Sequence, residues 1–253
     1  MTITAVVIAR NEKENIIPCI KSLVWCDEIL LIDDDSTDET VALARSEKPE
    51  IKVYKRKSEG NFAEQRNFTL DKVASDWVIF IDSDERVSPQ LADEIKDKLK
   101  KDTNCQGYFL KRRDYFGGDF LKFGETSDIK LLRIGRRNSG LWEGIVHENW
   151  HIVGSKETLS IPLDHYLHPT IREYLSKINF YTDRLVVQWK IENKKIHGWE
   201  IIIYPMGKFI LNYFLKLGLL DGMPGLIYAL MMSFHSFLIR SKYYLSQKKK
   251  INS

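Results

Sequence analysis

Short apolar segments alternate with helical segments through the first 110 residues, and this alternation restricts the fold more than any other feature of the sequence. Strands are expected at 3–9, 28–32, 51–55, 77–81 and 106–111. These segments are continuously apolar rather than alternating, which is typical of strands buried on both faces. With helices between them, the pattern predicts an α/β fold built from parallel βαβ units.

The helical segments carry recognisable start signals. Ser88 is expected to cap a helix over 88–100, with Pro89 in its first turn. Asp38 or Thr37 is expected to open the helix that begins at Thr40. A further helix is expected over 62–74.

Beyond Arg113 the pattern is less regular. The aromatic, glycine-containing stretch 114–128 predicts a loop that shapes a site. Short strands are expected at 130–134 and 144–146, and a helix over 171–193.

We therefore expect two domains. The first, over 1–168, would comprise two parts, 1–112 and 113–168. A helical region over 169–253 would follow it.

Composition excludes several classes of protein. With 43% hydrophobic and 29% charged residues, the chain is neither disordered nor collagen-like. The 38 basic and 35 acidic residues give a net charge of +3, too balanced to indicate a nucleic-acid partner. Its three cysteines form no CxxC pair, and the first residues lack the features of a secretory signal. A cytosolic protein is expected.

Two acidic clusters follow predicted strands, and ligands of parallel α/β sheets bind beyond the carboxyl ends of the strands. Asp33, Asp34 and Asp35 follow the strand 28–32. Adjacent carboxylates repel one another, so this run favours a role as acceptors for ribose hydroxyls or base N–H groups. The alternative is an acidic helix N-cap, for which one such residue would suffice.

The second cluster, Asp82-Ser83-Asp84-Glu85, follows the strand 77–81. Carboxylates spaced in this way can hold one Mg²⁺ or Mn²⁺, which completes its shell with substrate phosphates. The alternative is again an acidic helix start.

Four segments resemble, in the same order, motifs of the GT-A glycosyltransferases of family 2. They are IARNE, IDDDSTDET, NFAEQRNFTL with Arg66-Asn67, and FIDSDE. The second segment resembles the signature VDDGSTDGT, with Asp35 in place of the usual glycine.

The resemblance implies an inverting, metal-dependent enzyme with a Rossmann-like mixed sheet and a UDP-sugar donor. In its catalytic domain, 1–168, residues 1–112 would be the nucleotide-sugar-binding half and 113–168 the acceptor-side half. Asp34 would contact the uracil, Asp82 the ribose, and Asp84 the metal that bridges the diphosphate. The remaining donor-site residues implied by the resemblance are Arg10, Glu12, Arg66 and Ser83.

The second half resembles a narrower group, the bacterial lipopolysaccharide-core β-1,4-glucosyltransferases. The segments that carry this resemblance are WEGIVHE, DHYLHPT and YFLKLGLLDGMPGL. It implies transfer of a hexose, glucose in the first instance, to a cell-envelope glycolipid or lipid-linked saccharide. Where the family often has an arginine before this region, this sequence has Lys130-Leu-Leu-Arg133. It is therefore open which of these two basic residues meets phosphate.

An inverting transferase needs a general base for the acceptor hydroxyl, and two glutamates can serve. Glu148 is favoured, because its pair with His147 matches the subgroup, and Glu143 is second. If the residues between them are extended, the two point to opposite faces. His147 and His165 either bind metal or phosphate or are packed histidines.

The tail predicts peripheral attachment to a membrane. The apolar run 223–239 is short for a span, and Lys208 and Lys216 lie among aromatic residues, as in an interfacial helix. Terminal lysines would meet anionic headgroups. The expected location is the inner face of the bacterial cell membrane. The alternatives are helices packed internally or a homodimer interface.

Two other functions compete. A nucleotidyltransferase would normally carry a glycine- and lysine-rich phosphate loop, which IARNEKEN lacks. A non-catalytic sugar-nucleotide-binding membrane protein would not need Asp34, Asp84 and Glu148 intact.

Overall fold

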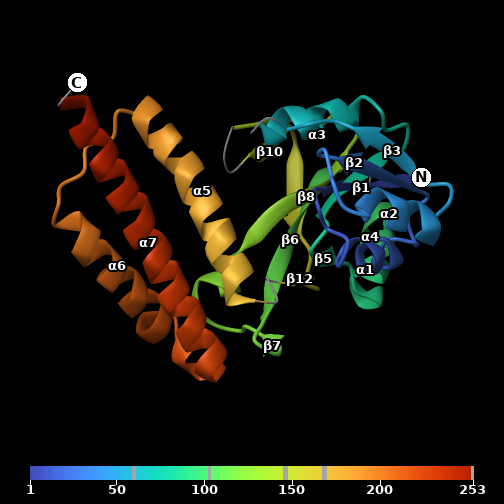
Figure 1. Cartoon of the computed structure of the whole chain (residues 1–253). Coiled ribbons are helices and arrows are strands. Elements are labelled where there is room, and N and C mark those ends of the chain that lie inside the picture. Colours follow the sequence, from blue (N-terminus) through green and yellow to red (C-terminus); the bar gives the residue numbers. More distant parts are fainter. Residues whose placement is uncertain (59–60, 102–103, 145–147, 167–169, 252–253) are drawn as a thin grey trace. The chain divides into compact units, whose positions relative to one another are not determined.

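The computed structural model describes residues 1–58, 61–101, 104–144, 148–166 and 170–251 (Figure 1). The chain divides into two compact units, which we describe separately. The first comprises Met1–Arg112 and Ile129–Tyr166, and the second Arg113–Asp128 and Leu167–Ser253. Residues of the expected acceptor-side half therefore occur in both units, with 113–128 grouped with the C-terminal helices. The functional division of the chain remains a prediction.

A mixed sheet forms the first unit, in the order β3-β2-β1-β4-β8-β6. Four parallel strands are β1 (Ile3–Ala9), β2 (Glu28–Asp33), β3 (Lys52–Lys55) and β4 (Trp77–Asp82). The strands β6 (Cys105–Phe116) and β8 (Lys130–Arg136) continue the sheet antiparallel. The predicted α/β class with flanking helices is confirmed.

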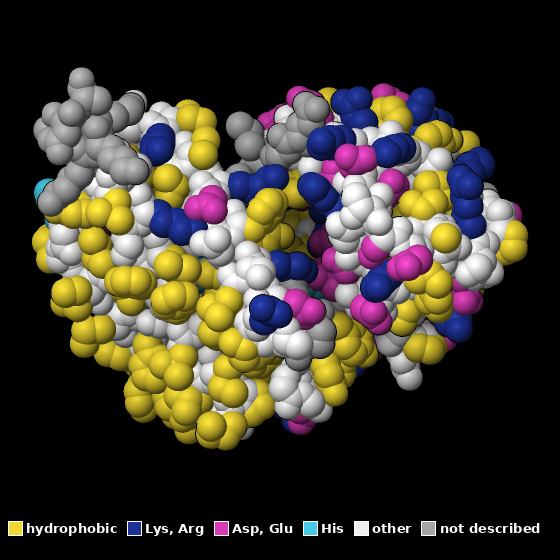
Figure 2. Space-filling view, in the orientation of Figure 1, with side chains coloured by type: hydrophobic (Ala, Val, Ile, Leu, Met, Phe, Trp, Pro, Cys, Tyr) yellow, Lys and Arg dark blue, Asp and Glu magenta, His cyan; other side chains and the backbone are white. Residues whose placement is uncertain are grey.

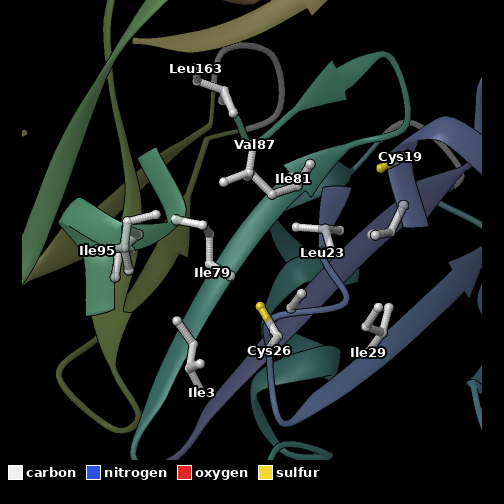
Figure 3. Close-up of a cluster of buried hydrophobic side chains, with 14 of the residues drawn as sticks. Ile3, Cys19, Leu23, Cys26, Ile29, Ile79, Ile81, Val87, Ile95 and Leu163 are labelled. Atoms are coloured by element: carbon white, nitrogen blue, oxygen red, sulfur yellow. The ribbon is translucent and has the colours of Figure 1, made fainter. Parts of the chain in front are cut away.

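Both faces of the parallel strands are buried, as their continuous apolar sequences predict. On one face, residues such as Val7, Leu31 and Ile79 pack against α1 (Ile16–Ser22) and α4 (Pro89–Lys101). Figure 3 shows side chains from these strands and helices pointing toward one another.

On the other face, Phe80 and its neighbours pack against α3 (Phe62–Leu70) and a small antiparallel hairpin. The hairpin consists of β9 (Gly140–Glu143) and β10 (Asn149–Ile152). Trp142 and Trp150 of the hairpin stack on each other and meet the Phe80 ring edge-on.

Local start signals agree with the expectations, while several ends differ. Leu91 N donates to Ser88 Oγ (3.2 Å), so Ser88 caps α4. At the start of α2 (Thr40–Glu47), Thr40 N donates to Asp38 Oδ1 (3.0 Å), but the N-cap residue is Glu39, whose side chain makes no capping bond. The helix expected over 62–74 ends at Leu70. The strand expected at 144–146 falls largely outside the described residues, and β9 ends before it.

Short elements complete the first unit. Its remaining strands are β5 (Glu85–Arg86), β11 (Ser155–Thr158) and β12 (Leu163–Tyr166). β12 pairs antiparallel with β5, which places His165 opposite Glu85.

Three helices dominate the second unit (Figure 1): α5 (Ile171–Ile191), α6 (Glu200–Ile210) and α7 (Gly222–Ile251). Its other elements are β7 (Asp119–Phe120), η1 (Gly124–Asp128), the π-turn η2 (Leu211–Leu215) and η3 (Gly218–Asp221). α7 packs against both other helices: Tyr174 of α5 clusters with Tyr228 and Met231, and Ser233 Oγ donates to the Pro205 carbonyl of α6 (2.8 Å).

Two non-glycine residues adopt left-handed backbone conformations where β1 and β2 end. Asn11 has φ +55° and Asp35 has φ +64°. The latter explains why glycine is usual at this point of the motif, and aspartate is among the side chains that tolerate the conformation. Asn11 ties the two loops together, because its N–H donates to Ser36 Oγ (3.0 Å) and its Oδ1 accepts from Thr37 N (2.7 Å).

We predict that Asn11→Val lowers the free energy of unfolding by about 2 kcal/mol. A β-branched residue is strained in this conformation and also loses the bond to Thr37 N. Urea denaturation followed by circular dichroism measures the change. Asn11→Gly is the matched control, since it removes the hydrogen bond without the strain and should cost roughly half as much. Equal losses in the two variants would contradict the contribution of strain.

Candidate active site

The predicted acidic clusters lie at one edge of the sheet. The register pairs Ala9 with Asp33 and Ile8 with Asp82, so the carboxyl ends of β2 and β4 flank that of β1. Arg10 follows β1 at the same edge and is exposed. This is the edge at which parallel α/β sheets bind ligands.

The three consecutive aspartates have different partners, which relieves the repulsion expected among them. Asp33 Oδ1 accepts from Ser36 N (3.1 Å) and supports the turn. Asp34, only 4% exposed, accepts from Ser58 N (2.5 Å) and Ser58 Oγ (3.0 Å). The bond from Lys55 (2.8 Å) lowers the pKa of Asp35, which lies on the surface. Asp34 is thus the member held in a fixed orientation at the strand edge.

Asp82 is held by two buried arginines. Its Oδ1 pairs with Arg66 Nη2 (3.2 Å) and its Oδ2 with Arg133 Nη2 (2.5 Å). Although burial opposes ionisation, the charges of Arg133 and Arg66 lower the pKa of Asp82 to about 2. Asp82 is therefore a fixed anion, and both of its oxygens already accept from the protein.

Glu85 holds both Arg133 and the backbone of Asp82 in place. Its Oε1 accepts from Arg133 (2.9 Å), and its Oε2 accepts from Asp82 N (2.9 Å). Burial raises the pKa of Glu85, although the charge of Arg133 opposes the shift. The side chain of Arg133 is 7% exposed and pairs with Asp82 and Glu85. Lys130 on the same strand is exposed.

Arg66 joins Asp82 to the hairpin. Its Nη2 lies 3.0 Å from Glu148 Oε1, and its guanidinium stacks 4.7 Å from the Trp142 ring centre. Its Nη1 is buried and has no hydrogen-bond partner among the described residues. Asn67, the other half of the Arg-Asn pair, clamps the backbone of Trp142 through two hydrogen bonds (2.8 and 2.9 Å). α3 therefore positions Arg66 and, through Asn67, also the hairpin.

The structure separates the two candidate bases. Glu148 has a 14% exposed side chain and contacts Arg66. Glu143 is 70% exposed and lies 3.8 Å from His151. Glu148 thus joins the cluster around Asp82, and the described contacts of Glu143 do not. His147 lies outside the described residues.

Asp84 faces His165 of β12. Its Oδ2 lies 3.6 Å from His165 Nε2, and its carbonyl accepts from Tyr166 N (2.8 Å). Among the described residues there is no group of three or more His, Cys, Asp or Glu side chains placed to hold a metal ion. One carboxylate with an imidazole still suits Mn²⁺ or Mg²⁺ when substrate phosphates supply the other ligands.

The remaining predicted donor-site residues are placed as follows. Glu12 accepts from Asn15 Nδ2 (2.8 Å), and its N–H donates to Thr40 Oγ1 (2.8 Å). Ser83 is buried, and its carbonyl accepts from Arg86 Nη1 (2.6 Å). Arg86 also donates to the Asn15 carbonyl (3.0 Å) and so fixes the turn after β4. Sequence reasoning missed Arg86 and the pairing of Arg133 with Glu85.

Comparisons with known proteins agree with this geometry. The family model "Glycosyl transferase family 2" matches residues 4–151, and the chain belongs to this family. The chain is 29% identical to the lipopolysaccharide core biosynthesis glycosyltransferase LpsC of Rhizobium meliloti, over 96% of this chain and 92% of that protein. An uncharacterized glycosyltransferase of Rickettsia conorii is 25% identical, over 99% and 92%.

A solved structure shares the fold. The crystal structure of S. aureus TarS 1–349 matches 94% of this chain and 81% of that chain, with a TM-score of 0.50 and 16% identity. The predicted GT-A architecture and the resemblance to family 2 are therefore confirmed, and the protein is a glycosyltransferase of that family.

We predict that Arg133→Met lowers the free energy of unfolding by about 3–5 kcal/mol, because it leaves Asp82 and Glu85 buried without their cation. Thermal and urea denaturation measure the loss. Lys130→Met, an exposed change on the same strand, is the control and should be nearly neutral. Adding Glu85→Gln to Arg133→Met should recover part of the loss; strictly additive effects would contradict coupling between Arg133 and Glu85.

Proposed function

We propose that this glycosyltransferase moves a hexose, glucose in the first instance, from a UDP-sugar to a glycolipid or lipopolysaccharide-core-type acceptor of the cell envelope. The observation that carries the proposal is the cluster in which Arg66 joins Asp82 and Glu148 at the carboxyl edge of the sheet. The likeness to LpsC over nearly the whole chain supports the acceptor class.

The donor would bind across the ends of β1, β2 and β4. Asp34 is a fixed acceptor for the N–H of uracil, and Asp82 is a fixed anion for the ribose hydroxyls. The unpaired Nη1 of Arg66 offers a buried donor for an anionic oxygen. Arg10, Glu12 and Ser83 complete the proposed pocket.

The residues present fit a divalent cation. Asp84 and His165 would hold it, whereas both oxygens of Asp82 already accept from arginines. A bound cation would supply charge neutralisation for the leaving diphosphate.

Glu148 is the proposed general base. It would accept the proton of the acceptor hydroxyl as that oxygen attacks the anomeric carbon and the bond to the diphosphate breaks, inverting the configuration. Trp142 and Asn67 hold the hairpin that presents Glu148, so base and donor aspartate share one scaffold. Glu143 is retained as the second candidate.

A lipid-linked acceptor places the reaction at a membrane, and we propose the inner face of the cell membrane as the location. Among the described residues, one helical stretch, Gly218–Gln247, is long and apolar enough to cross a bilayer, and a third of its most apolar window is buried. Because α7 packs between α5 and α6, the buried third of this window has an explanation within the unit, and we take this packing to favour peripheral attachment.

UDP release from UDP-sugars, with and without Mn²⁺, tests the proposed activity. A nucleotidyltransferase would instead release pyrophosphate from a nucleoside triphosphate. A non-catalytic binding protein would show donor-dependent thermal stabilisation without turnover. A panel of nucleotide sugars in the same thermal-shift assay identifies the base and the sugar.

We predict that Asp84→Asn abolishes Mn²⁺-dependent stabilisation by UDP-sugar and lowers turnover by at least about 10²-fold, because the cation loses its carboxylate. Calorimetric titration with UDP in the presence and absence of Mn²⁺ measures the effect. Asp35→Asn, the same chemical change at a partly exposed strand-end aspartate that pairs with Lys55, is the control and should keep metal-dependent binding. Unchanged turnover in Asp84→Asn would refute the cation site.

We predict that Glu148→Gln lowers kcat by about 10²–10⁴-fold while donor affinity changes little, since a base contributes to rate rather than to binding. Glu143→Gln is the matched control, with the same chemical change on an exposed side chain of the same hairpin. Steady-state kinetics separates kcat from KM. The opposite result, a loss confined to Glu143→Gln, would transfer the role to that residue.

A further inference from the structure

The segment 201–223 of the second unit exposes apolar side chains, whereas its charged side chains are only partly exposed. Every exposed residue in this stretch is apolar or glycine. Its exposed large side chains are Ile202, Ile203, Tyr204, Met206, Ile210, Leu211, Phe214, Leu215, Leu217, Leu219, Leu220 and Met223. Figure 2 shows hydrophobic side chains gathered over the part of the molecule that contains α6 and the start of α7. We call these residues the apolar face.

The three charged residues of the segment are partly exposed, and each pairs with a group of the segment 113–128. Lys208 Nζ lies 2.6 Å from Glu125 Oε1, and Lys216 Nζ lies 3.5 Å from Asp128 Oδ2. Asp221 accepts from the backbone N–H groups of Lys122 (3.0 Å) and Phe123 (3.0 Å). Asn212, 1% exposed, also donates to Glu125 (3.2 Å). The segment 113–128 thus neutralises the charges that the helices would otherwise present.

This finding changes the expected mode of attachment. From the sequence, Lys208 and Lys216 were expected to meet the membrane interface as free cations. In the structure Lys208 pairs with Glu125 and Lys216 with Asp128, and Lys242 is likewise paired with Asp183 (2.7 Å). Attachment through these lysines is therefore not what the structure favours. The side chains of Lys248, Lys249 and Lys250 are outside the part of the chain that the structure describes.

We infer that the apolar face inserts into the acyl-chain region of one bilayer leaflet, and that apolar burial rather than lysine attraction holds the enzyme there. The inference rests on the proposed function, which brings a lipid-linked acceptor to this enzyme. Charged residues that pair with one another are typical of segments embedded in lipid. Within 201–223 no exposed residue is charged, so the face itself offers a protein partner no charged contact.

The turn at the end of α6 keeps this face continuous. Leu217 adopts φ +58°, and a β-carbon at Gly225 would overlap the Gly218 carbonyl oxygen. The chain therefore reverses tightly between α6 and α7, and the two charged residues of the turn, Lys216 and Asp221, are paired within the unit. The close approach accounts for Gly225, and the turn leaves Leu215 (72% exposed) and Met223 (65%) on its outside.

The native thiols make a site-specific test possible on the full-length protein. Cys19, Cys26 and Cys105 are at most 5% exposed, so a cysteine introduced at the surface can be labelled selectively with an environment-sensitive fluorophore. Met206→Cys and Leu215→Cys place the label on the apolar face. Val187→Cys, an exposed apolar position on α5 beside charged residues, is the control.

Labels at 206 and 215 should shift to shorter emission wavelengths on pure phosphatidylcholine vesicles, both at low salt and in about 1 M NaCl, where charge attraction is screened. The label at 187 should not. Binding that requires anionic lipid and is lost in high salt would overturn the inference. So would shifts at 206 and 215 without vesicles in a protein that sediments as a dimer, because the face would then join two copies.

A pair of charge substitutions gives an independent measurement. Leu215→Asp should weaken binding to the same vesicles by about tenfold or more, since an aspartate is costly in the acyl-chain region. Val187→Asp should change it by less than about twofold. Equal effects of the two substitutions would overturn the assignment of the face. Donor binding, measured in parallel by thermal shift with UDP-sugar, shows that each variant is folded.

Failure of the inserted apolar face can be distinguished from failure of the proposed function. UDP release with a water-soluble acceptor reports on the active site without a membrane. Turnover without vesicle binding would refute the inserted face and leave the proposed transferase intact. Vesicle binding reported by the labels at 206 and 215, without sugar transfer, would refute the proposed activity but still support insertion of the apolar face.

Discussion

The ion pairs of Asp82 with Arg66 and Arg133 are the interaction on which the candidate site depends. They connect α3, the end of β4 and the antiparallel strand β8, and Arg66 extends the connection to Glu148 before β10. Each arginine is almost fully buried, so neither could remain there without its acids. Arg66 therefore orients both Asp82 and Glu148, the proposed base, and Arg133 holds Asp82 from the other side.

Such a network is costly to bury, and stability alone is a weak reason to keep it, because apolar residues of similar volume often replace buried ion pairs without loss. Its value lies in orientation. Charges fixed before the substrate arrives do not need to reorganise during the reaction, and this is the main source of electrostatic stabilisation in enzymes. Glu85 illustrates the point: it meets no solvent, yet it holds both Arg133 and the backbone of Asp82.

The fold of the first unit was largely predictable, and the reasons are local. Continuous apolar strands such as 3–9 and 77–81 have few alternatives to burial in a parallel sheet, and Ser88 with Pro89 specifies a helix start. The edge at which Asp34 and Asp82 lie also follows from the strand order. The positive φ of Asp35 was signalled only by its place in a motif that usually has glycine.

The contacts that define the site were not predictable, because they join residues far apart in the sequence. Nothing near Arg133 in the chain indicates that it pairs with Glu85, 48 residues earlier. Arg66 and Glu148 are 82 residues apart. Preference for Glu148 over Glu143 rested on a motif, whereas the structure distinguishes the two by burial, 14% against 70% exposed.

The same limitation explains the different picture of the tail. In the sequence, Lys208 and Lys216 among aromatic residues are indistinguishable from the snorkelling lysines of an interfacial helix. Their acids, Glu125 and Asp128, lie more than 80 residues earlier, in a segment expected to be a loop. With those pairs formed, the exposed residues of 201–223 are apolar or glycine. A lysine's sequence neighbours describe its helix, but its ion-pair partner decides whether its charge reaches a membrane.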